Sequence, residues 1–450
     1  MTKNLTEGNP AKVLFFFTLP LIAGNMFQQL YSLVDTFIVG RFLGVEALAA
    51  VGCTGSLMFL MMGFIMGLTS GFTIRTGQKF GAGDMAGVRR STAACVLLSV
   101  VSSVVLTALG IAFSRDILVW MQTPPEILEG AVSFISIIYG GMSMWVFFML
   151  ETNIIRALGD SKTSTYMLGF GLLLNILLEP VFIVVLDWGI PGAAWATIVS
   201  QIIGNTLCLF YMLRRFPVLR VQRQDWHLSL QELWKHARLG LPMAFQTSII
   251  ALGTIIMQVA VNHLGALAVA AYAVAQKVDS IATMPAMSFG LAIAAYAAQN
   301  YGARQYQRID EGIKKCLWMS ISFSLAAAVF NILAGPWIMG IFVGSGEAEV
   351  IEYGRLYLVV NGIFYAVMAA MFVYRNALQG LGQAMIPTIA GVLELLMRAV
   401  GAILLVEWWG YLGICFANPL AWIVSTIPMA YTFYSMQRGF HQRLRAGREL

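Results

Sequence analysis

Hydrophobic residues occur along this chain in long blocks separated by short polar segments. The first block, from Val13 to Val39, reads VLFFFTLPLIAGNMFQQLYSLVDTFIV and is long enough to cross a bilayer as a tilted helix. Windows of about 20 apolar residues, bounded by charged residues, glycine or proline, define such spans. They predict twelve spans: 13–38, 47–74, 92–113, 131–154, 164–186, 192–213, 240–262, 267–298, 316–341, 353–378, 386–406 and 412–435. The blocks are continuously apolar and not alternating, so they predict helices and not the strands of a barrel.

The composition supports this interpretation, because 59% of the residues are hydrophobic, 11% are charged and the mean hydropathy is +0.76. A soluble protein carries about 25% charged residues. The polar start MTKNLTEGNPAK does not resemble a cleavable signal, so we expect the first span to remain in the mature protein. The five cysteines show no paired or metal-ligand spacing and are expected to pack as small hydrophobic residues.

Positive charge is distributed unevenly between the two sides that twelve spans define. With the N-terminus in the cytoplasm, 23 of the 28 Lys and Arg residues lie in inside segments, and only Arg41, Arg115 and Arg355 lie outside. The positive-inside rule therefore predicts that both termini are cytoplasmic. The longest inside connection, 214–238, is basic and contains Trp226 and Trp234, which favours an amphipathic linker on the membrane surface. Topology accounts for this charge, so no nucleic-acid partner is expected.

The second half of the chain repeats motifs of the first. Leu19-Pro20 returns as Leu241-Pro242, and Leu43-Gly44 returns as Leu264-Gly265, at offsets of 222 and 221 residues. The repeat predicts an all-α membrane protein with an N-lobe at 1–213, a cytoplasmic linker at 214–239 and a C-lobe at 240–450 that ends in a short basic tail. Since each copy holds six spans, the lobes are expected to be related by a pseudo-two-fold axis along the membrane normal. A cleft between two such lobes is typical of a secondary transporter, for which a monomer is sufficient.

The first span contains a single ionisable residue, Asp35. A carboxylate in hydrocarbon costs about 2.5 to 3.5 kcal/mol on insertion scales, so an acid in a span indicates function. Asn175 and Glu179 lie four residues apart on one face of the fifth span, and Thr197 lies on the sixth. Carboxylate, amide and hydroxyl oxygens suit a small cation, and two adjacent acids also suit proton exchange. The alternative is that the acids only hydrogen-bond to neighbouring helices.

The second half carries its own membrane charges. Glu394 and Arg398 are spaced i, i+4 and predict a structural ion pair, whereas Lys277 and Asp279 point in different directions and each need a partner elsewhere. Flexible methionines also suit a pocket that accepts many shapes, although apolar residues at helical spacing usually pack or face lipid. The candidates for a substrate cleft are Gln28, Met62, Met66, Lys277, Met284, Met287 and Arg398.

Several of these residues form a pattern that resembles a known family. Leu19-Pro20, Val34-Asp35-Thr36, Gly40, Gly67, Gln78 and Gly81 resemble the multidrug and toxic compound extrusion family, and the resemblance covers nearly the whole chain. Pro285, Gly290, Gln299, Asn300-Tyr301-Gly302-Ala303 and Arg308 resemble most closely the branch that includes the staphylococcal multidrug exporter.

The resemblance implies a V-shaped pair of six-helix lobes that exports cationic, amphipathic drugs in exchange for H⁺ or Na⁺. It also implies that Asp35, Asn175, Glu179 and Thr197 bind the coupling cation, with Na⁺ as one candidate ligand. Glu179 stands where the family commonly has Asp, so the exact ligand distance does not carry over from the family. Some branches place acids in spans seven and ten; this chain lacks them, which argues against a C-lobe cation site of that type.

The leading hypothesis is therefore a proton- or sodium-coupled multidrug antiporter of the cytoplasmic (inner) membrane that confers antibiotic resistance. It works by alternating access and needs no cofactor beyond the coupling ion. The alternative is a lipid-linked oligosaccharide flippase of the same superfamily, which needs more membrane cations than Lys277 and Arg398 provide. An enzyme is not expected, because the chain has no HExxH or GxSxG motif and its four histidines lack metal spacing.

Overall fold

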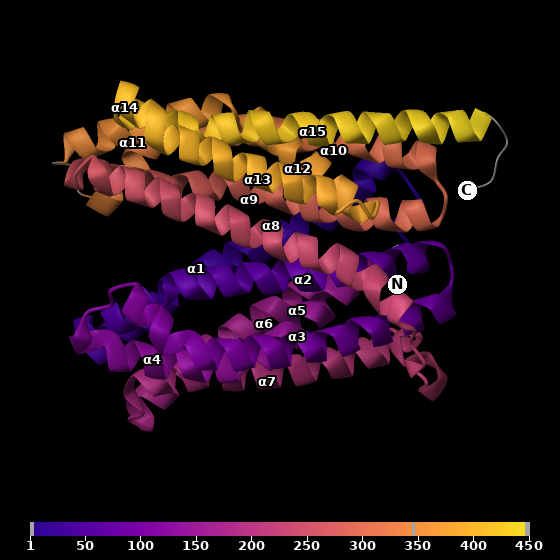
Figure 1. The fold of residues 1–450 in the computed structure, drawn as a ribbon, viewed down its shortest axis with the longest axis horizontal. Coiled ribbons are helices and arrows are strands. Elements are labelled where there is room, and N and C mark those ends of the chain that lie inside the picture. Colours follow the sequence, from indigo (N-terminus) through magenta and orange to yellow (C-terminus); the bar gives the residue numbers. More distant parts are fainter. Residues whose placement is uncertain (1–3, 344–346, 446–450) are drawn as a thin grey trace. The chain divides into compact units, whose positions relative to one another are not determined.

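The computed structural model describes residues 4–343 and 347–445, and these residues form helices and short connections without any strand. Ten helices of the described residues are long and apolar enough to cross a membrane. Two further spans consist of helix pairs that bend by 49° and 54°, which brings the number to twelve and confirms the predicted all-α membrane fold. The α-helices are labelled in Figure 1.

The first half of the chain contains seven α-helices and three short elements. They are α1 (Pro10–Cys53), α2 (Gly55–Gly81), α3 (Met85–Trp120), α4 (Pro125–Gly140), α5 (Met142–Ala157), α6 (Ser161–Pro180), the π-helix η1 (Val181–Val185), α7 (Gly189–Arg215), and the 3₁₀ turns η2 (Pro217–Leu219) and η3 (Arg223–Trp226). The second half contains α8 (Leu230–His263), α9 (Ala266–Gly302), α10 (Tyr306–Val343), α11 (Ala348–Ile363), α12 (Tyr365–Gly380), α13 (Met385–Val400), the π-helix η4 (Gly401–Leu405), α14 (Val406–Trp409) and α15 (Tyr411–Arg445).

The described chain packs as two compact units. Unit 1 contains residues 23–244, and unit 2 contains residues 4–22 together with 245–343 and 347–445. The start of α1 therefore belongs to unit 2, and the start of α8 belongs to unit 1. The two change-over points are 222 residues apart, which is the offset of the Leu-Pro motif. The predicted division at 213 and 240 did not include this exchange of helix starts.

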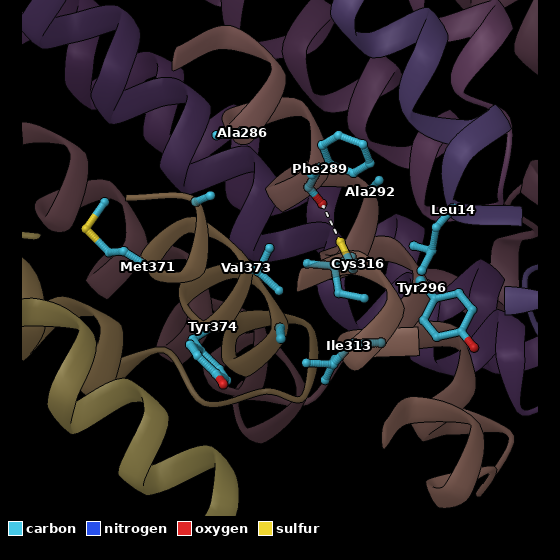
Figure 2. Close-up of a cluster of buried hydrophobic side chains, with 14 of the residues drawn as sticks. Leu14, Ala286, Phe289, Ala292, Tyr296, Ile313, Cys316, Met371, Val373 and Tyr374 are labelled. Carbon is cyan, nitrogen blue, oxygen red and sulfur yellow. Dashed lines mark hydrogen bonds between the residues drawn. The ribbon is translucent and has the colours of Figure 1, made fainter. Parts of the chain in front are cut away.

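Polar groups of unit 2 hold the segment that precedes α1. The backbone N–H of Leu5 donates to Gln299 Oε1 at 3.0 Å, and Arg308 donates to the carbonyl oxygen of Gly8 at 2.6 Å. Farther along, Leu14 lies beside Tyr296 in the buried cluster of unit 2 (Figure 2). Buried apolar contacts and backbone hydrogen bonds thus fix the beginning of α1 in this unit.

The backbone repeats its irregular features as well as its motifs. Gly44 has a φ of 86° and interrupts α1, and Gly265 has a φ of 94° and precedes α9. Glycine adopts such angles without steric cost. Helix α1 continues beyond Gly44 to Cys53, so α2 begins at Gly55, eight residues after the predicted start of the second span. The π-helices η1 and η4 occupy corresponding positions, 220 residues apart.

The connection between the two halves is shorter than predicted, because α8 begins at Leu230 and continues through residue 240 without a break. Its 3₁₀ turn η3 contains Asp225, which is 2% exposed. The carboxylate of Asp225 accepts hydrogen bonds from the Gln222 backbone at 2.8 Å and from Arg89 Nε of α3 at 3.2 Å. This part of the connection therefore packs on unit 1, while its position on a membrane surface stays a prediction.

Candidate cation site

Helix α1 contributes an acid and a phenol to unit 1. Asp35 and Tyr31 lie one turn apart on α1, and both side chains are half-buried. The Tyr31 hydroxyl donates to Asp35 Oδ1 at 3.3 Å. The phenol thereby orients the carboxyl group, and Tyr31 is a contributor that the sequence analysis missed.

Helix α6 contributes Asn175 and Glu179, which are 3% and 1% exposed. Pro180 follows directly and has no N–H to donate to the carbonyl of residue 176, so the α-helix ends and the chain continues as η1. Gly192 of α7 lies against this turn, since a Cβ there would stand 2.9 Å from the Phe182 carbonyl oxygen. Proline and glycine together bring α7 close to the end of α6.

Thr197 of α7 links the two helices. Asn175 Nδ2 donates to Thr197 Oγ1 at 3.1 Å, and Thr197 Oγ1 donates to the Ala193 carbonyl oxygen at 3.1 Å. With its nitrogen engaged, Asn175 keeps a buried Oδ1 that has no hydrogen-bond partner. A polar oxygen left in this way costs free energy unless a donor or a cation satisfies it.

The two carboxyl groups meet within unit 1. Asp35 and Glu179 are close enough to interact, and Tyr31 lies within reach of both Glu179 and Thr197. Both oxygens of Glu179 are buried without a donor, and no ion pair of the described residues involves either acid. The structure therefore brings together all four residues that the sequence proposed, while their role as cation ligands stays a prediction.

The donor set consists of hard oxygen atoms. Two carboxyl groups, an amide oxygen and a hydroxyl favour a proton or a small hard cation such as Na⁺. No group of three or more His, Cys, Asp or Glu side chains that could hold a metal ion occurs in the described ranges.

The seven substrate-cleft candidates lie on membrane helices of both units. Gln28, Met66, Lys277 and Met287 are exposed, Met62 is half-buried, and Met284 and Arg398 are buried. Their contact with a drug stays a prediction. Arg398 already donates to Glu394, to Asn418 Oδ1 at 3.2 Å and to the Ile250 carbonyl oxygen at 3.3 Å.

The predicted ion pair of the second half is present but larger than expected. Glu394 accepts from Arg398 at 2.7 Å and from Arg375 of α12 at 2.6 Å. Arg375 lies inside α12, within the tenth predicted span, and is 6% exposed. A buried carboxylate between two guanidinium groups explains why an arginine is tolerated there.

Two further acids on the membrane helices accept hydrogen bonds from uncharged side chains. Asp279 accepts a hydrogen bond from Tyr365 of α12, so its partner lies on another helix, as predicted. Glu151 of α5, which the sequence analysis overlooked, is 5% exposed. With the Asn205 amide turned so that its nitrogen faces Glu151, that nitrogen lies 2.8 and 2.9 Å from the two carboxyl oxygens and donates to them. The criterion that identified Asp35 would also have found Glu151, because Glu151 lies inside the fourth predicted span.

Comparison with known proteins assigns the family. A family model described as MatE matches residues 20–181 and 242–404, which fall in the two copies of the repeat. The chain belongs to the MatE family. The resemblance inferred from the sequence motifs is thereby confirmed, and this MatE protein is a multi-pass membrane transporter and not an enzyme.

Relatives of the MatE chain match it over most of its length. The probable multidrug resistance protein YoeA of Bacillus subtilis is 27% identical over 444 residues, which cover 96% of this chain and 95% of YoeA. The multidrug export protein MepA of Staphylococcus aureus is 20% identical over 388 residues, which cover 85% and 84% of the two chains. A solved outward-facing MATE transporter of the MOP superfamily has a TM-score of 0.90 at 22% identity, covering 98% of this chain and 99% of that one, and shares the fold.

Proposed function

We propose that this MatE protein exports cationic, amphipathic drugs from the cytoplasm in exchange for H⁺ or Na⁺. The main observation in support is the carboxyl group of Glu179. It is buried, neither of its oxygens has a hydrogen-bond donor, and it lies against Asp35. Membership of the family and the multidrug names of YoeA and MepA support drugs as the substrate class. The charge distribution supports a cytoplasmic membrane with both termini inside.

Charge neutralisation is the physical basis of the proposal. Two carboxylates in contact repel each other, and no lysine or arginine of the described residues pairs with them. A bound proton or Na⁺ removes this repulsion and gives the orphaned Asn175 Oδ1 a positive partner. The coupling ion therefore stabilises the arrangement in which Asp35 of α1 lies against Glu179 of α6.

Transport follows when the ion and the drug prefer different conformations. Binding at Asp35 biases the position of α1 relative to α6 and α7 within unit 1, and release of the ion removes that bias. Residues 10–22 of the same helix pack in unit 2, so a change at Asp35 is transmitted along one continuous helix. The coupling free energy is then the difference in the free energy of ion binding between the drug-bound and drug-free states.

The test is efflux of ethidium from proteoliposomes with a pH gradient and a sodium gradient imposed separately. Asp35→Asn should abolish efflux under the active gradient while the purified protein keeps its unfolding temperature. The matched control is Glu46→Gln, which removes an exposed acid from the same helix and should export normally. Full drug resistance of cells carrying Asp35→Asn would refute the proposal.

A protein that transports ethidium under neither gradient would redirect attention to the flippase alternative. In that case, deletion of the gene should cause a lipid-linked precursor to accumulate without a change in drug sensitivity.

A further inference from the structure

Unit 1 contains a cavity of about 280 Å³ where the end of α2, the start of α3 and the first turns of α8 meet. Four cationic side chains line it, namely Arg75 and Lys79 from α2, Arg90 from α3 and Lys235 from α8. The positive-inside distribution predicts that this end of the unit faces the cytoplasm. A water molecule occupies about 30 Å³ of liquid, so the cavity has room for a phosphate group and an attached glycerol.

The acids that line the cavity already have partners. Asp84 accepts from Lys79 Nζ at 2.9 Å and from the Gly87 backbone at 2.8 Å, so it neutralises Lys79 and caps α3. Glu232 accepts from the Ser229 backbone at 3.3 Å in the first turn of α8. The local positive charge is therefore only partly compensated.

Arg90 and Lys235 are the cations that remain available. Both are exposed, and neither forms a hydrogen bond or an ion pair within the part of the chain that the structure describes. They extend from different helices toward one cavity, which is the arrangement that binds an anion by two charges.

His236 forms part of the cavity wall. Its Nδ1 lies 2.9 Å from the Glu232 carbonyl oxygen and donates there, and its Nε2 lies 2.8 Å from Ser91 Oγ. Ser91 Oγ in turn lies 2.8 Å from Thr76 Oγ1. This chain of hydrogen bonds is complete in itself, so His236 forms part of the wall and leaves ligand binding to the cations.

The surface beside the cavity is apolar and aromatic. Trp234, next to Lys235, is 61% exposed, and Leu230, one turn earlier on α8, is 85% exposed. Exposed tryptophan beside basic residues is typical of the boundary between lipid and water. We propose that the cavity binds the phosphate of an anionic phospholipid headgroup, held chiefly by Arg90 and Lys235, with the acyl chains along the Trp234 face.

Lipid retention by the purified full-length protein tests the proposal without measuring transport, so a failure here leaves the proposed function untouched. The protein in detergent is exchanged into phosphatidylglycerol or phosphatidylcholine, and bound lipid is counted by native mass spectrometry. Juxtamembrane cations contribute about 1 kcal/mol each to binding of anionic lipid, so Arg90→Gln with Lys235→Gln should weaken phosphatidylglycerol retention about 20- to 30-fold. Phosphatidylcholine retention should not change.

The control removes the same amount of charge from elsewhere. Lys314→Gln with Lys315→Gln, on α10 of unit 2, should retain phosphatidylglycerol like the parent. Equal losses in the two double variants would overturn the proposal, because the effect would then be one of net charge. A second measurement uses inorganic phosphate and follows the unfolding temperature. If phosphate raises this temperature and phosphatidylglycerol is not retained, the site binds free phosphate and the lipid assignment is overturned.

Discussion

The contact between Asp35 and Glu179 makes a quantitative prediction for the variant Glu179→Gln. Two unit charges about 4 Å apart repel by about 4 kcal/mol at an effective dielectric constant near 20. A cation bound between them gains this energy, and the gain corresponds to about 1,000-fold in affinity. Glutamine keeps the shape of the side chain and removes one of the charges, so the gain disappears.

The expected effect of Glu179→Gln is therefore on ion binding and not on folding. The amide nitrogen can donate to Asp35, and a hydrogen bond to a charged acceptor contributes about 1.5 to 3 kcal/mol. We expect the free energy of unfolding to stay equal to that of the parent or to rise slightly. We expect the concentration of driving ion at half-maximal ethidium efflux to rise by a factor of about 100 to 1,000.

The assay measures efflux from proteoliposomes against a series of external ion concentrations, alongside thermal unfolding of the purified protein. Glu46→Gln serves again as the control for loss of one acid on the surface of α1. An unchanged half-maximal ion concentration in Glu179→Gln would refute the reasoning. So would a fall in unfolding free energy of more than about 3 kcal/mol, since that value is typical of a buried side chain with a structural role.

Further variants test three local features. Gly192→Ala places a methyl group 2.9 Å from the Phe182 carbonyl oxygen, and overpacking of this kind should cost about 1 to 2 kcal/mol of stability. Glu394→Gln leaves two buried guanidinium groups without a counter-charge and should cost about 3 to 5 kcal/mol, whereas Arg375→Met, which keeps one ion pair, should cost less. Asp84→Ala should cost about 1 kcal/mol through loss of the α3 cap, and Asp84→Asn should retain most of that contribution.

Each of these predictions has its own check in chemical or thermal unfolding. Gly169→Ala, where a Cβ meets no atom within 4 Å, should be neutral or stabilising, and a loss equal to that of Gly192→Ala would refute the packing argument. A smaller loss for Glu394→Gln than for Arg375→Met would refute the charge argument.

The prediction for Asp84 has a pH dependence. The hydrogen bond from Lys79, aided by the Gly87 backbone, holds the pKa of Asp84 below its ordinary value. The ion pair and the charged cap therefore stabilise the fold above the ordinary pKa of aspartate, and this contribution is lost as the pH falls through the lowered pKa. Asp84→Asn should remove that pH dependence, and an unchanged profile in the variant would contradict the assignment.

Much of the fold followed from the sequence, because each span is a local property. A run of about 20 apolar residues must form a helix in lipid, where every backbone group needs an internal partner. The repeat was visible for a similar reason, since Gly44 and Gly265 are required by one backbone angle at two corresponding turns. The acid Asp35 stood out because charge in hydrocarbon is costly.

Sequence spacing could not show which acids meet. Asn175 and Glu179 are neighbours by helical periodicity, but their contact with Asp35 of α1 depends on how the helices of unit 1 pack. Arg375 illustrates the same limit, because only helix packing shows that Glu394 of α13 is its counter-ion.

The amino-acid sequence by itself thus determined the spans, the repeat, the family resemblance and four residues of the candidate cation site, but not Tyr31. The tertiary structure decided that the start of α1 packs in unit 2 and the start of α8 in unit 1, that Glu179 lies against Asp35, and that basic side chains of α2, α3 and α8 surround one cavity. The physical reason is the separation in sequence over which each effect acts. Hydrophobicity and backbone geometry act between residues close in sequence, whereas ion pairs and cavities arise from residues that only packing brings together.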